Sequence, residues 1–476
     1  MNSLKKIMSC VLSCVIVLGM CSCIPNSEKI ETITWLVPGD SQADIDTVME
    51  AANKIIEPEI GAKLDLQFID TAAYAEKMKM NMASGKAYDL CFTGYINNYQ
   101  SAVANGGLMD ITDAIEKYAP KLKEAIPDYF MNSAKVDERI YGVPNVQVIS
   151  NPVCLVTRKS LADKYCPNFS EIKTAEQLEK YLKKLKENEP DLYPFNPSGC
   201  IFAGAKYEVI TGNVAIKKDG SDNKLVVMSQ TDEYKEDAKI LHSWYEKGYI
   251  RKDIASAGNT LSTPAENLKV GVTVSTWKPG QESTYIEQYG EEPVYSLLTN
   301  PYVPRTGALA TMISVGNKCK NVEKAVKIIE LMNTNKELYN IISYGIEGKH
   351  YILNESGKVK KTENSGYNVS ASSWEFGNQF NALLTENQAD DIWERTQSMN
   401  DSADKSPLLG FVPNIDSLTN ELSNIEAVKS EYKESIEYGT GDFDQYWDEY
   451  TEKLNNAGQE KVLNELQKQV DEFLKR

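Results

Sequence analysis

The sequence predicts an α/β protein made of two lobes, with a helical C-terminal region. Strand and helix patterns alternate over the first part of the chain, and this alternation is typical of a parallel sheet covered by helices. A single hydrophobic core rarely organises a chain of 476 residues, so two lobes are expected. The last part of the chain combines helical periodicity with many charged side chains, which favours packed helices.

The chain begins with a segment typical of a signal peptide. Lys5 and Lys6 precede an apolar run from Ile7 to Met20, which is too short to span a bilayer stably. We therefore expect residues 1–22 to be removed on export and the remaining chain to act outside the cytoplasm. No later apolar stretch of the sequence is long enough to cross a membrane.

Two cysteines at the end of this segment are candidates for lipidation. Cys23 follows the small residue Ser22, which a lipoprotein signal peptidase accepts at its cleavage position, whereas Cys21 follows the bulky Met20. The sequence favours Cys23 and leaves Cys21 open. Residues 23–30 would then form a lipid-anchored tether at the extracellular face of a bacterial cell membrane.

The chain that follows this segment is strongly acidic. Without residues 1–22 it carries 49 basic and 68 acidic side chains, a net charge of −19. Such a surface repels nucleic acid, so a nucleic-acid partner is excluded. The acidity is explained by solubility next to a charged envelope.

Metal-dependent and histidine-dependent chemistry find little support in the residues. The only histidines of the chain are His242 and His350, which argues against multi-histidine metal sites and histidine-based triads. The five cysteines after Cys23 are widely spaced and form no CxxC pair, so we expect mostly buried free thiols. The sequence contains no Walker loop and no GxSxG elbow. We therefore expect no metal, no cofactor and no catalytic residue.

A strand–helix unit starts the folded part and then repeats. Residues 32–37 are mostly β-branched or aromatic, which predicts a buried strand, and a turn at 38–40 ends it. Apolar residues recur every three or four positions from residue 43, which predicts a helix. A second strand at 64–68, a methionine-rich helix and a third strand at 89–92 follow. This order predicts parallel strands.

Ligands of such sheets bind beyond the carboxyl ends of the strands. The loops at 38–40 and 93–97 are therefore expected to face a ligand. Farther along, alternating apolar residues predict a strand at 268–274, and periodic apolar residues predict a helix at 322–332.

Two tryptophans are candidates for sugar binding, which needs flat apolar rings with amides and carboxylates at their edges. Trp277 follows the strand at 268–274, where its ring would project from a loop. Trp374 begins the stretch 374–379, which places a ring beside an acid and two amides. Core packing is the competing interpretation for both rings, and it is the preferred one for Trp35, which lies inside a strand.

Four local patterns resemble those of the family 1 extracellular solute-binding proteins of ABC importers. They are Tyr-Asp-Leu at 88–90, Gly-Leu-Met-Asp-Ile-Thr at 107–112, Ile-Tyr-Gly-Val-Pro at 140–144 and Glu-Lys-Gly-Tyr-Ile at 246–250. Their order and spacing together are specific. The region from residue 344 onward resembles the LipO-like subgroup, so the resemblance covers nearly the whole chain after the leader.

The resemblance implies a periplasmic-binding-protein-like fold whose lobes close on a ligand. The chain would cross between the lobes near 145–151, 293–298 and 345–351. The implied division assigns residues 31–147 and 295–347 to lobe 1, and residues 148–294 and 348–476, with the helical C-terminal region, to lobe 2.

The implied function is the capture of a small oligosaccharide for an ABC importer, without catalysis. By position, the residues expected to line the cleft are Asp40, Thr93, Tyr95, Asn97, Asn145, Gln147, Trp277, Trp374, Glu375 and Asn378. The implied partners are the oligosaccharide, the ABC permease subunits and the membrane that holds the lipid anchor. The chain itself would be a monomer.

Two other functions stay open at this level. A peptide or another small solute could bind to the same scaffold. A secreted glycoside hydrolase needs only two carboxylates, and a chain with 68 acids cannot be excluded by count. Against the hydrolase, the sequence shows no cluster of aromatic residues around an acid pair.

Overall fold

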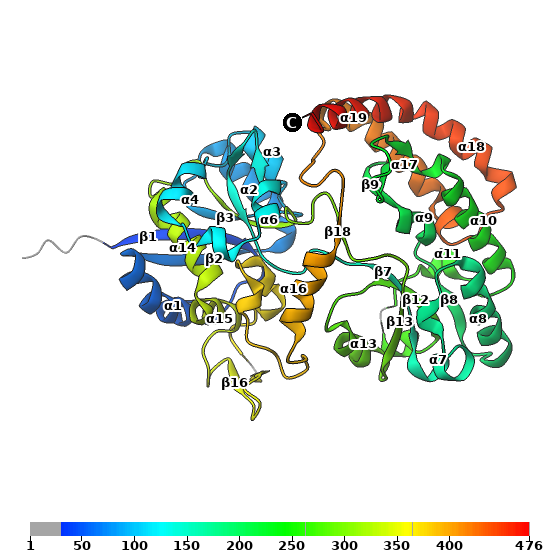
Figure 1. The fold of residues 1–476 in the computed structure, drawn as a ribbon, viewed down its shortest axis with the longest axis horizontal. Helices are drawn as coiled ribbons and strands as arrows, with labels where there is room; N and C mark the ends of the chain where they lie inside the picture. The colour runs from blue at the N-terminus through cyan, green and yellow to red at the C-terminus, as the bar shows by residue number, and fades with distance from the viewer. Residues whose placement is uncertain (1–29, 262, 364, 476) are drawn as a thin grey trace, which may run out of the picture.

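The computed structural model describes residues 30–475 except 262 and 364, and these residues form two α/β lobes (Figure 1). The expected signal peptide and the candidate lipidation site Cys23 lie outside the described residues. The chain passes between the lobes at 145–152, 298–310 and 403–415. The predicted two-lobed α/β fold with a helical C-terminal region is confirmed.

Lobe 1 is built on a mixed sheet with the strand order β2-β1-β3-β15-β6. Its elements are β1 (Glu31–Pro38), α1 (Ile45–Ile60), β2 (Ala62–Ile69), α2 (Thr71–Ser84), β3 (Leu90–Gly94), α3 (Tyr99–Ala104), α4 (Thr112–Tyr118), α5 (Leu122–Ala125), α6 (Asp128–Ser133), β4 (Lys135–Val136), β5 (Arg139–Ile140), β6 (Gly142–Pro144), β15 (Thr311–Val315), α14 (Val322–Thr334), α15 (Lys336–Tyr344), β16 (Tyr351–Leu353), β17 (Val359–Lys361), η3 (Ser370–Glu375), η4 (Gln379–Asn381) and α16 (Ile392–Ser402). β1 pairs in parallel with β2 and β3, as the repeated unit predicted, whereas β15 runs antiparallel to β3 and β6.

Burial explains the first unit of lobe 1. The second half of β1 is continuously buried, most of β2 is buried at alternate residues, and α1 buries Val48, Ala52 and Ile56 against the sheet. Helix α1 ends at Gly61, whose φ of 71° suits a left-handed C-cap. Asp89 accepts a hydrogen bond from the Thr34 N–H at 2.9 Å, so its carboxylate holds the start of β3 to β1.

Lobe 2 contains a sheet with the strand order β13-β7-β12-β8 and a smaller sheet with the order β11-β10-β9. Its elements are β7 (Val153–Arg158), α7 (Lys159–Tyr165), η1 (Phe169–Glu171), α8 (Ala175–Asn188), β8 (Tyr193–Asn196), α9 (Ile201–Lys206), β9 (Tyr207–Thr211), β10 (Val214–Lys217), β11 (Val226–Val227), η2 (Met228–Gln230), α10 (Asp232–Glu246), α11 (Ile254–Ala257), α12 (Pro264–Asn267), β12 (Val270–Thr276), α13 (Gln281–Tyr289) and β13 (Pro293–Leu297). The capping box of Thr174 and Gln177 starts α8.

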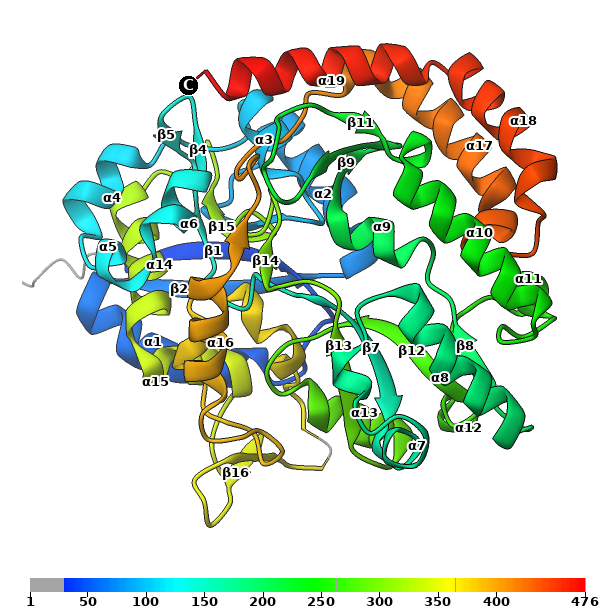
Figure 2. The same ribbon diagram turned by 45° about the vertical axis from the view of Figure 1, so that its right-hand side comes forward.

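The C-terminal region packs on lobe 2 as η5 (Asp416–Leu418), α17 (Thr419–Glu437), α18 (Phe443–Asn456) and α19 (Gln459–Phe473). Figure 2 shows these helices running along the outer side of lobe 2, with α19 reaching back toward lobe 1. Their inner faces share a core with β9 and β10, which includes Ile210, Val214, Tyr450 and Leu466.

The structure differs from the expected lobe boundaries in two places. Residues 293–297 form β13 inside the lobe 2 sheet, and the crossing follows them. The segment 348–402, which was expected in lobe 2, packs into the lobe 1 core through residues such as Tyr351 and Phe376. The last crossing therefore lies at 403–415 and not at 345–351.

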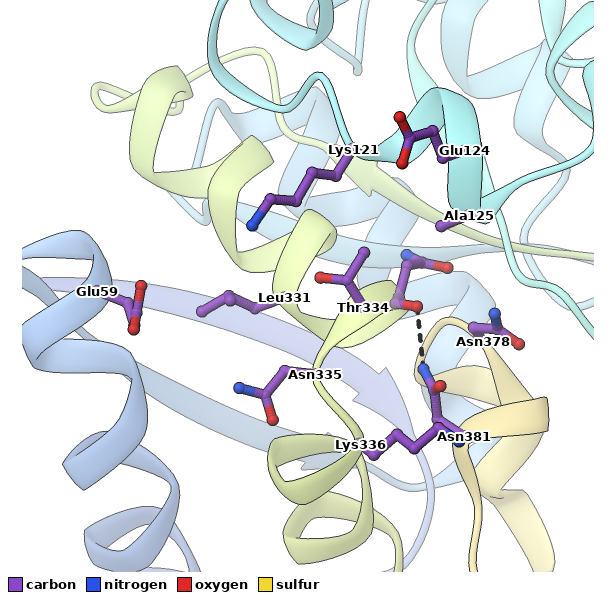
Figure 3. A pocket seen from close by; sticks show the side chains of 11 residues that line it. Glu59, Lys121, Glu124, Ala125, Leu331, Thr334, Asn335, Lys336, Asn378 and Asn381 are labelled. Carbon is purple, nitrogen blue, oxygen red and sulfur yellow. Dashed lines mark hydrogen bonds between the residues drawn. The ribbon is translucent and has the colours of Figure 1, made fainter.

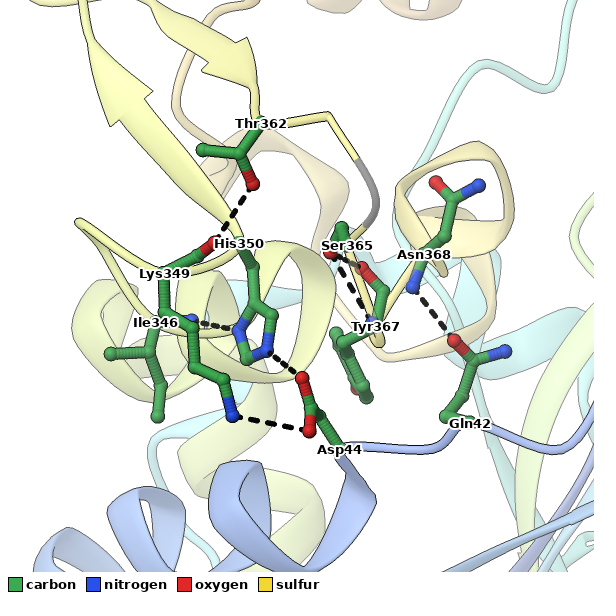
Figure 4. Close-up of polar contacts among 9 residues, drawn as sticks. All are labelled: Gln42, Asp44, Ile346, Lys349, His350, Thr362, Ser365, Tyr367 and Asn368. Carbon is green, nitrogen blue, oxygen red and sulfur yellow. Dashed lines mark hydrogen bonds and ion pairs between the residues drawn. The ribbon is translucent and has the colours of Figure 1, made fainter.

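Polar contacts explain why this segment stays in lobe 1 (Figure 4). The buried His350 accepts a hydrogen bond from the Ile346 N–H at Nδ1, so its Nε2 carries the proton that reaches Asp44 Oδ2 at 3.1 Å. Lys349 pairs with the other oxygen of Asp44 at 3.1 Å. These contacts hold the pKa of the Asp44 carboxyl below its ordinary value. The segment is thus fastened to the N-terminal cap of α1.

Candidate ligand-binding site at the junction of the lobes

Several of the predicted site residues meet on lobe 1, beside the first crossing. Asn145 donates from Nδ2 to the Glu375 carbonyl oxygen at 3.0 Å. Val146, the next residue, donates to the Gly377 carbonyl oxygen and accepts from the Gln379 N–H. Gln147 donates from Nε2 to Oγ1 of Thr311, the first residue of β15, at 2.6 Å. The crossing is therefore held between the segment 374–379 and the lobe 1 sheet.

An aromatic pair stands next to this crossing. The Tyr95 ring, 63% exposed, lies 5.9 Å from the Trp374 ring, with the planes tilted by 49°. Both rings pack edge-on against the fully buried Phe92, at 6.0 and 6.2 Å between centroids. Phe92 thus supports the pair from inside the lobe. Tyr95 and the half-buried Trp374 offer apolar ring surface of the kind that stacks against pyranose faces.

Glu375, the residue after Trp374, is only 3% exposed. Burial raises the pKa of its carboxyl to about 8, so the carboxyl is protonated at neutral pH. Its charge, when present, adds to the effect of burial in raising the pKa of Tyr95. A neutral Glu375 can donate as well as accept a hydrogen bond.

Three buried polar atoms in this region have no hydrogen-bond partner among the described residues: Glu375 Oε2, Asn145 Oδ1 and Asn97 Nδ2. They belong to three of the segments that carry the predicted site residues of lobe 1. Buried polar groups normally find partners, because an unpaired one costs about 1–3 kcal/mol. A polar molecule that reached these atoms would therefore gain hydrogen bonds.

Trp277 is contributed by lobe 2 and lies on the other side of the crossing. Its backbone N–H donates to the Pro152 carbonyl oxygen at 2.9 Å, which fixes the end of β12 to the start of β7. The half-buried ring packs against a cluster that includes Tyr285 and Tyr295. Trp277 is therefore neither sealed in a core nor free of support.

Two predicted residues have other roles. Thr93 is fully buried in β3, where its hydroxyl shares a 2.7 Å hydrogen bond with Ser314 Oγ, so the hydroxyl joins β3 to β15. Asn378 caps η4 by accepting from the Phe380 N–H at 3.0 Å. Asp40 is exposed on the loop after β1, at the same edge of the sheet as Tyr95. Thr93 was expected to line the cleft, but in the structure its hydroxyl is engaged inside lobe 1, because β15 brings Ser314 beside it.

Asn378 instead lines a broad, polar pocket of about 690 Å³ that lobe 1 forms alone (Figure 3). The ends of α1 and α14 and the starts of α5 and α15 surround it. Its amides are engaged in local structure, since Asn335 caps α15 and Asn381 donates to the Asn333 carbonyl oxygen. Asn333 Oδ1, which also lines this pocket, is buried without a hydrogen-bond partner among the described residues.

A cavity of about 250 Å³ lies beside Tyr95 and brings in residues that sequence reasoning missed. Arg305, Thr306 and Val412 line it and come from the second and third crossings. No local pattern marks these residues, because their position depends on pairing between segments about one hundred residues apart.

Two kinds of feature are not found among the described residues. Within the described part of the chain, no group of three or more His, Cys, Asp or Glu side chains is placed to hold a metal ion. Across the same residues, no helix combines the length and apolar character that a membrane span requires.

Comparison with known proteins shows which family has this architecture. A family model described as bacterial extracellular solute-binding protein matches residues 43–338, more than half of the chain. A domain of unknown function, DUF3502, matches residues 407–475, which include α17 to α19. A carbohydrate ABC transporter substrate-binding protein of Streptococcus pneumoniae serotype 4 is 31% identical over 454 residues, covering 92% of this chain and 90% of the relative.

Solved structures of an N-glycan transport solute-binding protein, NgtS from Streptococcus pneumoniae, share the fold. The NgtS structure that is not described as a complex has a TM-score of 0.81 at 31% identity and covers 94% of this chain and 99% of NgtS. The complexes with Man1GlcNAc and Man5GlcNAc have TM-scores of 0.69 and 0.65 at 30% and 31% identity, over 94% of this chain and 100% and 99% of theirs. The chain belongs to the bacterial extracellular solute-binding protein family.

Proposed function

We propose that this protein captures an oligosaccharide between its lobes and delivers it to an ABC importer. The observation that carries the proposal is the Tyr95–Trp374 ring pair at the lobe junction, together with the unpaired polar atoms of Glu375 and Asn145. Rings provide contact area for a sugar face, and the polar atoms orient its hydroxyl or amide groups. The glycan complexes of NgtS support the same class of ligand.

Closure of the lobes would bring Trp277 of lobe 2 toward the Tyr95–Trp374 ring pair of lobe 1. The TM-score falls from 0.81 for the NgtS structure not described as a complex to 0.69 and 0.65 for the two glycan complexes, at nearly equal identity. Because the three structures are of one protein, the difference arises from geometry and not from sequence. It supports a lobe arrangement that differs between ligand-free and glycan-bound protein, so that affinity would depend on the population of the ligand-bound arrangement.

Titration calorimetry with Man5GlcNAc, and with peptides as the competing ligand class, tests the proposal. We expect Trp374→Ala and Trp277→Ala each to weaken glycan binding by about 1–3 kcal/mol, the scale of an anchoring aromatic side chain. Trp447→Phe is the control, since Trp447 stacks on Phe443 at 4.4 Å within the C-terminal helices. Unchanged affinity in both alanine variants would remove the two rings from the site.

The same incubation separates a binder from a glycoside hydrolase. We expect no release of reducing ends from the glycan over a day with the wild-type protein. Release that disappears with one carboxylate variant would instead support the hydrolase.

The cellular setting is part of the proposal. The order of basic residues, apolar run and Cys23 supports a lipid anchor at the extracellular face of a bacterial cell membrane. The protein would act there as a monomer that hands its sugar to permease subunits.

A further inference from the structure

The second and third crossings form a two-stranded ribbon between the lobes. β14 (Tyr302–Val303) pairs in parallel with β18 (Asp404–Lys405), with Tyr302 opposite Asp404. Figure 1 shows β18 in the space between the two lobes. Successive side chains of a strand point to opposite faces, so each lobe meets a different set of ribbon residues.

On the lobe 2 side, one carboxylate holds both strands. Glu208 of β9 is 8% exposed and accepts hydrogen bonds from Tyr302 Oη at 2.7 Å and from Ser406 Oγ at 2.6 Å. Its other oxygen accepts from the Arg305 N–H at 2.6 Å. An ionised carboxylate only accepts, and here each of its three partners donates, so the set is complementary.

Arg305 extends this connection. Its guanidinium donates to the Ile210 carbonyl oxygen of β9 and to the Phe411 carbonyl oxygen, both at 2.8 Å. Burial lowers the pKa of Arg305, and the charge of Glu208 opposes that effect. The ribbon and the residues after it are thus bound to β9 by charged, directional hydrogen bonds.

On the lobe 1 side, the contacts are of another kind. Val303, Ala308 and Ala403 are buried in the lobe 1 core and have small apolar side chains. Lys405 adds its ammonium group 4.9 Å above the Tyr129 ring, and Gln100 donates to the Gly410 carbonyl oxygen at 3.1 Å. Apolar contacts are non-directional, so they resist sliding less than the hydrogen bonds on the opposite side.

We infer that Glu208 is a positioning residue that fixes the ribbon to lobe 2, so that lobe 1 turns against the apolar face of the ribbon when the protein closes. The inference rests on the proposed function for its use, since closure is what ligand capture requires. The attachment of the ribbon to lobe 2 through Glu208 can be tested on the ligand-free protein.

Glu208→Gln keeps one acceptor oxygen for the Arg305 N–H and turns an NH2 group toward the hydroxyls of Tyr302 and Ser406, which must then accept instead of donate. The charge-assisted hydrogen bonds that hold the ribbon are thereby lost at almost unchanged volume. We expect the ligand-free variant to sample a wider range of lobe angles, with a larger radius of gyration and maximum dimension in small-angle X-ray scattering. Backbone amide exchange at Arg305 should become about tenfold faster, because a charged acceptor is replaced by a neutral amide oxygen.

Asp237→Asn is the matched control. Asp237 is another buried acid of lobe 2, 5% exposed, and it accepts from the Ala203 N–H at 2.8 Å, away from the ribbon. Its variant should show faster exchange at Ala203 and wild-type scattering. Scattering of Glu208→Gln that superposes on the wild type would overturn the inference, and Ser406→Ala gives the same test if Glu208→Gln does not fold.

Ligand titration then separates the two proposals. If Man5GlcNAc binds the wild type, we expect Glu208→Gln to bind it more weakly, although Glu208 is expected to touch no ligand, whereas Asp237→Asn binds normally. If the wild type binds no glycan, the proposed function fails, while the scattering of the ligand-free proteins still decides the role of Glu208.

Discussion

Replacing Glu375 by glutamine should change how stability depends on pH. The pKa of this carboxyl rises from an ordinary 4.5 to about 8 in the folded protein because the group is buried. Between these values the unfolded chain releases a proton that the folded chain keeps, so the free energy of unfolding falls by about 1.4 kcal/mol per pH unit. Below pH 4.5 Glu375 is protonated in both states and does not lower the free energy of unfolding. By pH 8 its ionisation in the unfolded chain has lowered this free energy by about 5 kcal/mol.

Glutamine has nearly the same shape and no charge, so this loss should disappear in Glu375→Gln. The assay is urea unfolding of the wild type and the variant at intervals from pH 5 to 8.5, followed as the difference in free energy between them. We expect the difference to shift by about 4–5 kcal/mol in favour of the variant over this range. Parallel stability curves would refute a neutral, buried Glu375.

Asp237 provides the internal comparison. Burial raises the pKa of its carboxyl from 3.8 to about 6, with hydrogen bonds from backbone N–H groups opposing the rise. Asp237→Asn should therefore remove a pH dependence of about 3 kcal/mol that lies between pH 4 and 6. The two pH windows overlap between about pH 4.5 and 6, but between pH 6 and 8 only Glu375 changes the free energy of unfolding, so this range distinguishes the two variants.

Other predictions concern the anchor and the backbone. Cys23→Ser should move the protein from the detergent phase to the aqueous phase of a membrane extract, whereas Cys21→Ser should leave it in the detergent phase. Gly94→Ala should cost about 3 kcal/mol in urea unfolding, because the residue has a φ of 144° and a new Cβ would stand 2.1 Å from the Ala310 carbonyl oxygen. Gly204→Ala, in α9 with nothing within 4 Å of the new Cβ, should be neutral or gain about 0.5–1 kcal/mol.

The parts of the fold that sequence could predict are those set by local pattern. The buried character of residues 32–37 and the helical spacing after residue 43 predict β1 and α1, because burial on one face follows directly from the period. The position of Tyr95 after a parallel strand follows from the same kind of pattern, and that of Asn145 at the first crossing follows from the family resemblance. Their contact with a ligand stays a prediction.

The parts that sequence could not predict depend on distant partners. The family resemblance placed a crossing near 345–351, but the contact of His350 with Asp44 keeps that segment in lobe 1. The hydroxyl of Thr93 is used by Ser314, more than two hundred positions away. No local spacing carries information about such pairs.

The position of β15 in the lobe 1 sheet affects how the chain folds during its synthesis. This strand fills the gap between β3 and β6, yet it is synthesised after the whole first part of lobe 2. Until residue 315 is available, a growing chain exposes two unpaired strand edges that invite aggregation. Fragments that stop before β15 should therefore aggregate instead of forming a folded half-molecule.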